Sequence, residues 1–143
     1  MKMRKIWFFV FVAFSVLYVF SCRTAKVQNQ EQWITTPSGL EYLDKEIGYG
    51  NFPKQGQRVT INFIMKTEDG TVIEDTYQSK IPMSFILGKK DAIQGLEEGV
   101  ATMRVGGKRI LKVPPELGFG ASSVRGIPPN SKLIIEVELV KAE

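Results

Sequence analysis

The chain has 143 residues, of which 43% are apolar, and this is enough for one domain with a single modest core. The formal net charge is +4, but the first 21 residues hold Lys2, Arg4 and Lys5 and no acid, so the remainder carries 16 basic and 15 acidic side chains. This near balance excludes a large basic face for nucleic acid. With no histidine and one cysteine, the sequence excludes imidazole catalysis, an internal disulfide framework and a Cys-His pair, so we expect no metal and no cofactor.

The first segment has the pattern of an export signal. The basic residues of MKMRK precede an apolar run of 15 residues, Ile6 to Phe20, which is shorter than the ~20 residues of a membrane-spanning helix and typical of a signal peptide. Ser21 directly before Cys22 resembles the cleavage site of bacterial lipoproteins, although Phe20 is larger than the residue usual at its position. We expect residues 1–21 to be a signal peptide and Cys22 to be acylated. The protein would then be exported and lipid-anchored to the bacterial cell envelope, on the periplasmic or surface face of a membrane. An uncleaved signal anchor is the alternative, and it would also give a tethered, exported domain.

Residues 22–37 are polar and lack apolar periodicity, so we interpret them as a flexible tether. Trp33 and Ile34 are the exceptions, and we interpret Trp33 as an exposed aromatic residue of the tether rather than as part of the domain edge. The folded domain is then expected over residues 38–143.

Alternating apolar residues in this domain predict half-buried strands. The Asp69-Gly70 pair predicts a hairpin turn, and Pro114-Pro115 predicts the end of a strand. The predicted strands cover an edge strand around Leu40 and Tyr42, a long strand over 59–66, a return at 72–73 that leads into a loop over 75–81, and further strands at 85–87, 109–113 and 133–140.

One helical pattern lies within residues 87–103, where apolar side chains recur at spacings of three, four and three, namely Ile93, Leu96, Val100 and Met103. Asp91 is a suitable N-cap, and Gln94 three residues later completes a capping-box arrangement. Gly95 and Gly99 each cost about 1 kcal/mol relative to alanine in a helix, so this helix must be held by what packs on it. The sum is an α+β fold in which a mostly antiparallel sheet wraps around one short helix.

Several tags occur in a fixed order along the chain: the Asp69-Gly70 turn, FILGK at 85–89, GLEEGVATMRVG at 95–106, GFGA at 118–121, IPPN at 127–130 and LIIEVELVK at 133–141. In this order and spacing, the chain from about residue 38 onward resembles the FKBP-type peptidyl-prolyl cis-trans isomerases. The resemblance implies the FKBP fold and a shallow apolar pocket between helix and sheet that accepts an Xaa-Pro segment of an unfolded or extended polypeptide. Rotation about an Xaa-Pro bond needs no nucleophile, so the absence of histidine and of a second cysteine is no objection.

The resemblance also assigns roles to individual positions. Four residues match positions that act on the twisted bond, namely Phe63, Glu74 (with Asp75 as the alternative after a one-residue shift), Ile93 through its backbone amide, and Phe119. Seven match positions that bind the substrate, namely Ile73, Met83, Ala92, Leu96, Val124, Ile127 and Ile135. Taken by their alternation alone, many of these apolar residues would be plain core residues.

The substitutions relative to the common family pattern keep apolar character and remove two tyrosine hydroxyls, at Phe63 and Phe119. The resemblance therefore leaves several functions open. The first is an exported, membrane-tethered isomerase that assists the folding of envelope or surface proteins. The alternatives are a binding or chaperone module of low activity and a subunit of an envelope machine. We expect a monomer whose partners are proline-containing polypeptides and, through Cys22, a membrane.

Overall fold

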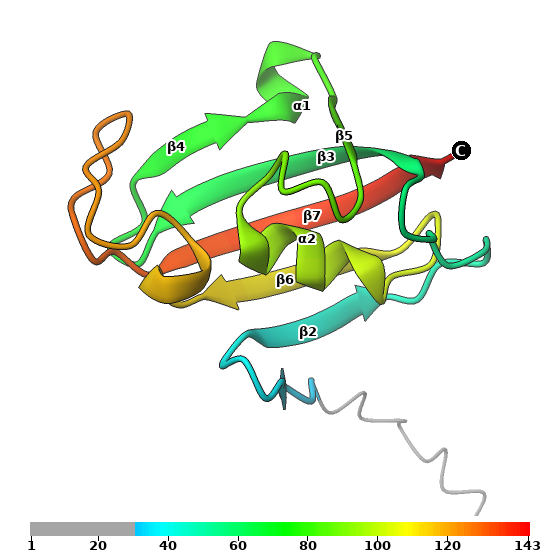
Figure 1. Ribbon diagram of the computed structural model, residues 1–143, viewed down its shortest axis with the longest axis horizontal. Helices are drawn as coiled ribbons and strands as arrows, with labels where there is room; N and C mark the ends of the chain where they lie inside the picture. The colour runs from blue at the N-terminus through cyan, green and yellow to red at the C-terminus, as the bar shows by residue number, and fades with distance from the viewer. Residues whose placement is uncertain (1–30) are drawn as a thin grey trace, which may run out of the picture. The chain divides into compact units, whose positions relative to one another are not determined.

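The computed structural model describes residues 31–143, which form one compact unit with its own core. The unit is an antiparallel sheet that wraps over a single helix of more than one turn, so the predicted α+β class is confirmed (Figure 1). The predicted signal peptide, Cys22 and residues 22–30 of the predicted tether lie outside the described residues. Among residues 31–143, no helix is long and apolar enough to cross a membrane.

Seven strands make up the sheet, in the order β1-β2-β6-β7-β3-β4, and every pair of neighbours is antiparallel. The fifth strand pairs with β3 on the same edge as β4. The strands are β1 (Ile34–Thr35), β2 (Glu41–Glu46), β3 (Arg58–Thr67), β4 (Val72–Asp75), β5 (Met83–Ile86), β6 (Lys108–Val113) and β7 (Leu133–Ala142). The helices are α1 (Thr76–Ser79), α2 (Gln94–Ala101) and the 3₁₀ turn η1 (Pro115–Leu117).

The N-terminal edge of the sheet differs from the expectation. Ile34 and Thr35 pair with Tyr42 and Glu41 of β2, so these two residues belong to the sheet and not to a tether, and β2 is not an edge strand. Trp33 is 36% exposed, and the Lys112 ammonium nitrogen lies 3.8 Å from the centroid of its ring. A cation over an aromatic face is attractive. Trp33 is therefore exposed, as predicted, but it packs against the domain edge and is not a residue of the tether alone.

The other edge of the sheet is shared by two strands that do not touch each other along β3. The pairing of β4 with β3 ends at Asp75, and the pairing of β5 with β3 begins at Met83. The predicted loop between these two residues contains the one-turn helix α1, and the Asp75 side chain caps it by accepting hydrogen bonds from Tyr77 N and Gln78 N. In the gap, the Thr76 hydroxyl accepts from Phe63 N at 2.8 Å and lies 3.2 Å from Phe63 O, to which it donates. This buried hydroxyl replaces the missing ladder bonds and fixes the backbone at Phe63.

The core lies between α2 and the inner face of the sheet. Alternate residues of β3, β6 and β7 are buried, which confirms the predicted alternation of the long strands. Leu96 and Val100 from α2 are buried against them, and so is Met103, which follows the helix.

The start of α2 differs from the predicted capping box. The N-cap is Ile93, with no side-chain cap, and the Asp91 carboxylate instead accepts a hydrogen bond from Ile86 N at 3.2 Å. The Glu97 carboxylate accepts from Gly88 N at 2.9 Å and from Ala92 N at 3.3 Å. A carboxylate in the first turns of a helix also interacts favourably with the helix dipole. Glu97 therefore holds the loop that enters the helix.

Two glycines let α2 lie very close to β6. A Cβ atom on Gly95 would be 2.5 Å from Val113 Cγ1, and one on Gly99 would be 2.6 Å from both Leu111 Cδ atoms. These distances are too short for any real side chain. The two glycines lower the helix propensity of α2, but their lack of a Cβ atom is what allows the helix to pack this closely on β6.

Gly99→Ala tests this packing. Alanine raises helix propensity by about 1 kcal/mol, but the added methyl group overpacks the core against Leu111, which typically costs about 1–3 kcal/mol. We expect a net loss of stability in urea unfolding. Gln94→Ala, at an exposed position of the same helix, is the matched control and should change stability by less than about 0.5 kcal/mol. A Gly99→Ala protein at least as stable as the wild type would contradict the packing argument.

Candidate functional site

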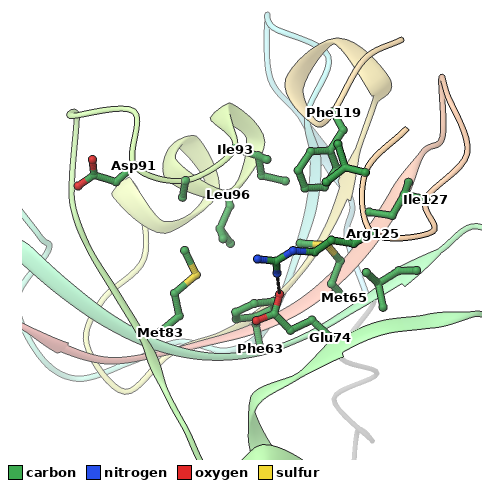
Figure 2. A pocket seen from close by; sticks show the side chains of 13 residues that line it. Phe63, Met65, Glu74, Met83, Asp91, Ile93, Leu96, Phe119, Arg125 and Ile127 are labelled. Carbon is green, nitrogen blue, oxygen red and sulfur yellow. Dashed lines mark hydrogen bonds and ion pairs between the residues drawn. The ribbon is translucent and has the colours of Figure 1, made fainter. Parts of the chain in front are cut away.

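A cavity of about 400 Å³ opens between the start of α2, the edge of the sheet and the loop after η1 (Figure 2). We call residues 120–127 of that loop the flap. Ten of the thirteen lining residues are apolar. The lining consists of Phe63 and Met65 from β3, Ile73 and Glu74 from β4, Met83 from β5, Asp91, Ala92 and Ile93 before α2, Leu96 from α2, Phe119, and Val124, Arg125 and Ile127 from the flap. An apolar concavity with a few polar groups at its rim is the usual form of a ligand site.

The cavity brings together ten of the eleven residues that the sequence singled out. They are Phe63, Ile73, Glu74, Met83, Ala92, Ile93, Leu96, Phe119, Val124 and Ile127. Asp75, the alternative to Glu74, instead caps α1. The individual roles of the ten residues stay predictions, but their common location is a property of the fold.

Ile135 is the exception and is a correction. It is fully buried on β7, opposite Met65 in the β3–β7 register and opposite Leu111 in the β6–β7 register, and it does not line the cavity. β7 lies in the middle of the sheet, and Met65 on the neighbouring strand lines the cavity instead. Ile135 is therefore a core residue beneath the site.

Three further residues line the cavity that the sequence does not single out as site residues. Met65 belongs to the predicted half-buried strand over 59–66, and its alternation with Phe63 is the signal that points to it. Asp91 has the pattern of a helix cap in the sequence. Arg125 carried no signal in the sequence, because only the fold brings the flap to β4.

The wall at the start of α2 presents a backbone donor. The Ala92 amide is engaged by Glu97, but the Ile93 amide has no hydrogen-bond partner among residues 31–143. The Ile93 carbonyl accepts from Leu96 N and Glu97 N, so the residue is anchored to the helix on its carbonyl side while its own N–H stays available. Such a donor can bind a carbonyl oxygen of a segment seated in the cavity.

Within the described part of the chain, no side chain that lines the cavity carries a hydroxyl, thiol or imidazole. Phe63 is 1% exposed and Phe119 is half-buried, so both present hydrocarbon to the cavity. Within residues 31–143, no group of three or more acidic, histidine or cysteine side chains is placed to hold a metal ion. The arrangement can bind an apolar segment, exclude water and donate one backbone hydrogen bond, all of which are non-covalent actions.

The flap is held at its base and turns sharply. Val124 and Ile127 form an isolated antiparallel bridge with a 2.8 Å bond from Ile127 N to Val124 O, and Arg125 and Gly126 between them have positive φ angles of 48° and 80°. The Ile127 side chain is 2% exposed and anchors the flap in the core. Arg125 lies at the turn, and its side chain is 75% exposed.

A model of the FKBP-type peptidyl-prolyl cis-trans isomerase family matches residues 49–140. "FK506-binding protein 4" of Dictyostelium discoideum is 42% identical over 108 residues, which cover 75% of this chain and 29% of that protein. The chloroplastic isomerase FKBP13 of Arabidopsis thaliana is 33% identical over 121 residues, covering 76% of this chain and 58% of that protein. The chain thus spans less than two thirds of the length of these curated relatives.

Solved structures give the same result for the fold. FkpA from Escherichia coli superposes with a TM-score of 0.74 at 36% identity, covering 80% of this chain and 53% of that chain. The crystal structure of AtFKBP13 superposes with a TM-score of 0.73 at 31% identity, covering 78% of this chain and 99% of that chain. The expected FKBP fold is therefore confirmed.

Phe119→Tyr tests the cost of the hydroxyl-free lining. A hydroxyl at this position can donate to a bound peptide, and a neutral hydrogen bond contributes about 0.5–1.5 kcal/mol. If the bond forms in the twisted state, isomerisation of an Ala-Leu-Pro-Phe peptide should accelerate about two- to tenfold in a protease-coupled assay. Phe52→Tyr adds a hydroxyl to a half-exposed ring outside the cavity and should change nothing. Unchanged turnover in Phe119→Tyr would show that the missing hydroxyl does not limit the site.

Proposed function

Because the chain belongs to the FKBP-type peptidyl-prolyl cis-trans isomerase family, we propose that it isomerises Xaa-Pro bonds of unfolded or extended polypeptides in the apolar cavity. The observation that carries this proposal is the cavity itself. Ten residues singled out by the family resemblance line it, and the Ile93 amide there has no hydrogen-bond partner within residues 31–143.

The chemistry suits a site without a nucleophile. The barrier to rotation about a peptide bond is about 18–20 kcal/mol and arises from amide resonance. Resonance separates charge in the planar form, so moving the bond from water into an apolar cavity disfavours that form relative to the twisted one. The Ile93 N–H can hold a substrate carbonyl while the proline ring packs against Leu96 and Phe63. Each ~1.4 kcal/mol removed from the barrier accelerates rotation tenfold.

A binding or chaperone module of low turnover is the second candidate. The observation that favours it is the hydroxyl-free lining, because the cavity can still hold an apolar segment while offering fewer contacts to the twisted bond. A subunit of an envelope machine is compatible with the same cavity. It would be supported if deletion of the protein harmed assembly while cavity substitutions did not.

We also propose that the domain acts outside the cytoplasm, tethered through acylated Cys22, as a monomer that assists the folding of envelope or surface proteins. The support is the sequence alone: the basic start, the apolar run and Ser21 directly before the only cysteine. Slow prolyl isomerisation limits folding over tens of seconds, so an isomerase placed where exported chains fold would be useful there.

Ile93→Asp tests the isomerase. Residues 31–143 should accelerate a proline-limited refolding reaction and the isomerisation of Ala-Leu-Pro and Ala-Phe-Pro peptides, because these segments fit the apolar cavity. A carboxylate at position 93 places charge in that cavity, so turnover and peptide binding should both be lost.

Ile47→Asp is the matched control, because Ile47 is 82% exposed and lies outside the cavity lining. Thermal unfolding of both variants separates lost activity from lost folding. Turnover retained by a folded Ile93→Asp protein would exclude this cavity as the active site. If the wild type gives no acceleration but retains binding to unfolded protein, the second candidate holds.

Cys22→Ser tests the tether in the full chain. The wild type should incorporate labelled fatty acid and partition into the detergent phase of Triton X-114, because a thiol is needed for acylation. Cys22→Ser should lose the label, whereas Ser21→Ala, which keeps a small residue before the cysteine, should retain it. An unlabelled wild type that remains in the membrane fraction would favour the uncleaved signal anchor.

A further inference from the structure

We propose that Arg125 makes the cavity favour an acidic side chain over a neutral polar or a basic one at the residue directly before the proline of a bound Xaa-Pro segment. This inference rests on the proposed function, because it concerns which segments the same cavity accepts. It starts from the three charged residues of the lining, which are Glu74, Asp91 and Arg125.

Among residues 31–143, Arg125 is the only cation that lines the cavity, and its side chain reaches Glu74 on β4. Figure 2 shows it extending from the flap toward Glu74 on β4, with its guanidinium above Phe63. Arg125 Nη1 lies 3.4 Å from Glu74 Oε2. A segment bound in the cavity would therefore lie near this guanidinium.

The ion pair leaves most of the guanidinium available. Arginine has five N–H donors in a planar fork, and within residues 31–143 only Nη1 of Arg125 has a hydrogen-bond partner. The contact is long, and the side chains are 75% and 42% exposed, so the pair is weak. The edge formed by Nε and Nη2 can take a second carboxylate in the bidentate geometry that arginine favours.

The other charges do not cancel this attraction. The Asp91 carboxylate accepts from Ile86 N, and in Figure 2 it points away from the centre of the cavity. Glu74 repels an incoming carboxylate, but it is already paired with Arg125, which reduces its effect. The remaining lining is apolar. An anion in the cavity is therefore attracted by Arg125, whereas a cation is attracted by Glu74 but repelled by the Arg125 guanidinium paired with it.

The test compares three peptides of the form Ala-Xaa-Pro-Phe, with Xaa as Glu, Gln or Lys, on residues 31–143. Binding by NMR titration and kcat/KM are both measured at low salt. The wild type should favour Glu over Gln by about two- to fivefold, as expected for an exposed ion pair, and should disfavour Lys. The preference should shrink at 0.5 M salt because screening weakens exposed pairs.

Three variants assign the effect. Arg125→Gln should bring the Glu to Gln ratio to about one, and Arg125→Glu should reverse it in favour of Lys, by the same exposed-pair magnitude. Glu74→Gln frees the guanidinium and should raise the preference for Glu. Arg104→Gln is the matched control, because Arg104 is an exposed arginine that lines a different cavity with Phe52. It should leave the ratio unchanged.

The outcomes separate this inference from the proposed function. If no peptide is isomerised, the catalytic proposal fails, while the binding ratios still test Arg125. If peptides bind and the Glu to Gln ratio is the same in the wild type and Arg125→Gln, the inference is overturned and the isomerase stands. A wild type that favours Lys over Glu would also overturn it and would assign the selectivity to Glu74.

Discussion

The close contact between α2 and β6 is the constraint on which the rest of the structure depends. Gly95 and Gly99 bring the helix so near to Val113 and Leu111 that no Cβ atom fits between them. The helix gives up about 1 kcal/mol of propensity at each glycine and gains burial of Leu96 and its neighbours against the sheet. Because the start of α2 is one wall of the cavity, the depth of that packing also sets the width of the site.

Polar contacts outside the apolar lining also hold the walls of the cavity. The Thr76 hydroxyl fixes the backbone at Phe63, and the Glu97 carboxylate holds the loop that ends at Ile93. Such contacts let hydrocarbon face the cavity without leaving backbone groups unpaired elsewhere, which would be costly. The Ile93 N–H is left available against this background. A preorganised donor in an apolar concavity suits rotation about an amide bond, since that reaction breaks no covalent bond.

The parts that the sequence predicts well are those that repeat a short period or a fixed spacing. The alternation of β3 and β7 and the helical spacing of Leu96 and Val100 follow directly from apolar periodicity. The family resemblance singles out ten of the lining residues, and the fold brings them together. The errors arise where tertiary contacts override local patterns. Asp91 has the features of a cap but bonds Ile86, and Ile34 joins the sheet although it follows a polar stretch. Arg125 meets Glu74 only because the flap folds over β4, a contact 51 residues apart in sequence.

The most direct test of the account is to record proton exchange spectra of an Ala-Leu-Pro-Phe peptide with ¹⁵N-labelled residues 31–143. If the cavity isomerises Xaa-Pro bonds, exchange peaks between the cis and trans proline signals of the peptide should appear only when the protein is present. The amide of Ile93 and the residues of the flap should also shift on titration, while exposed sites such as Ile47 should not. Shifts confined to surfaces outside the cavity, or exchange that persists in Ile93→Asp, would contradict the account.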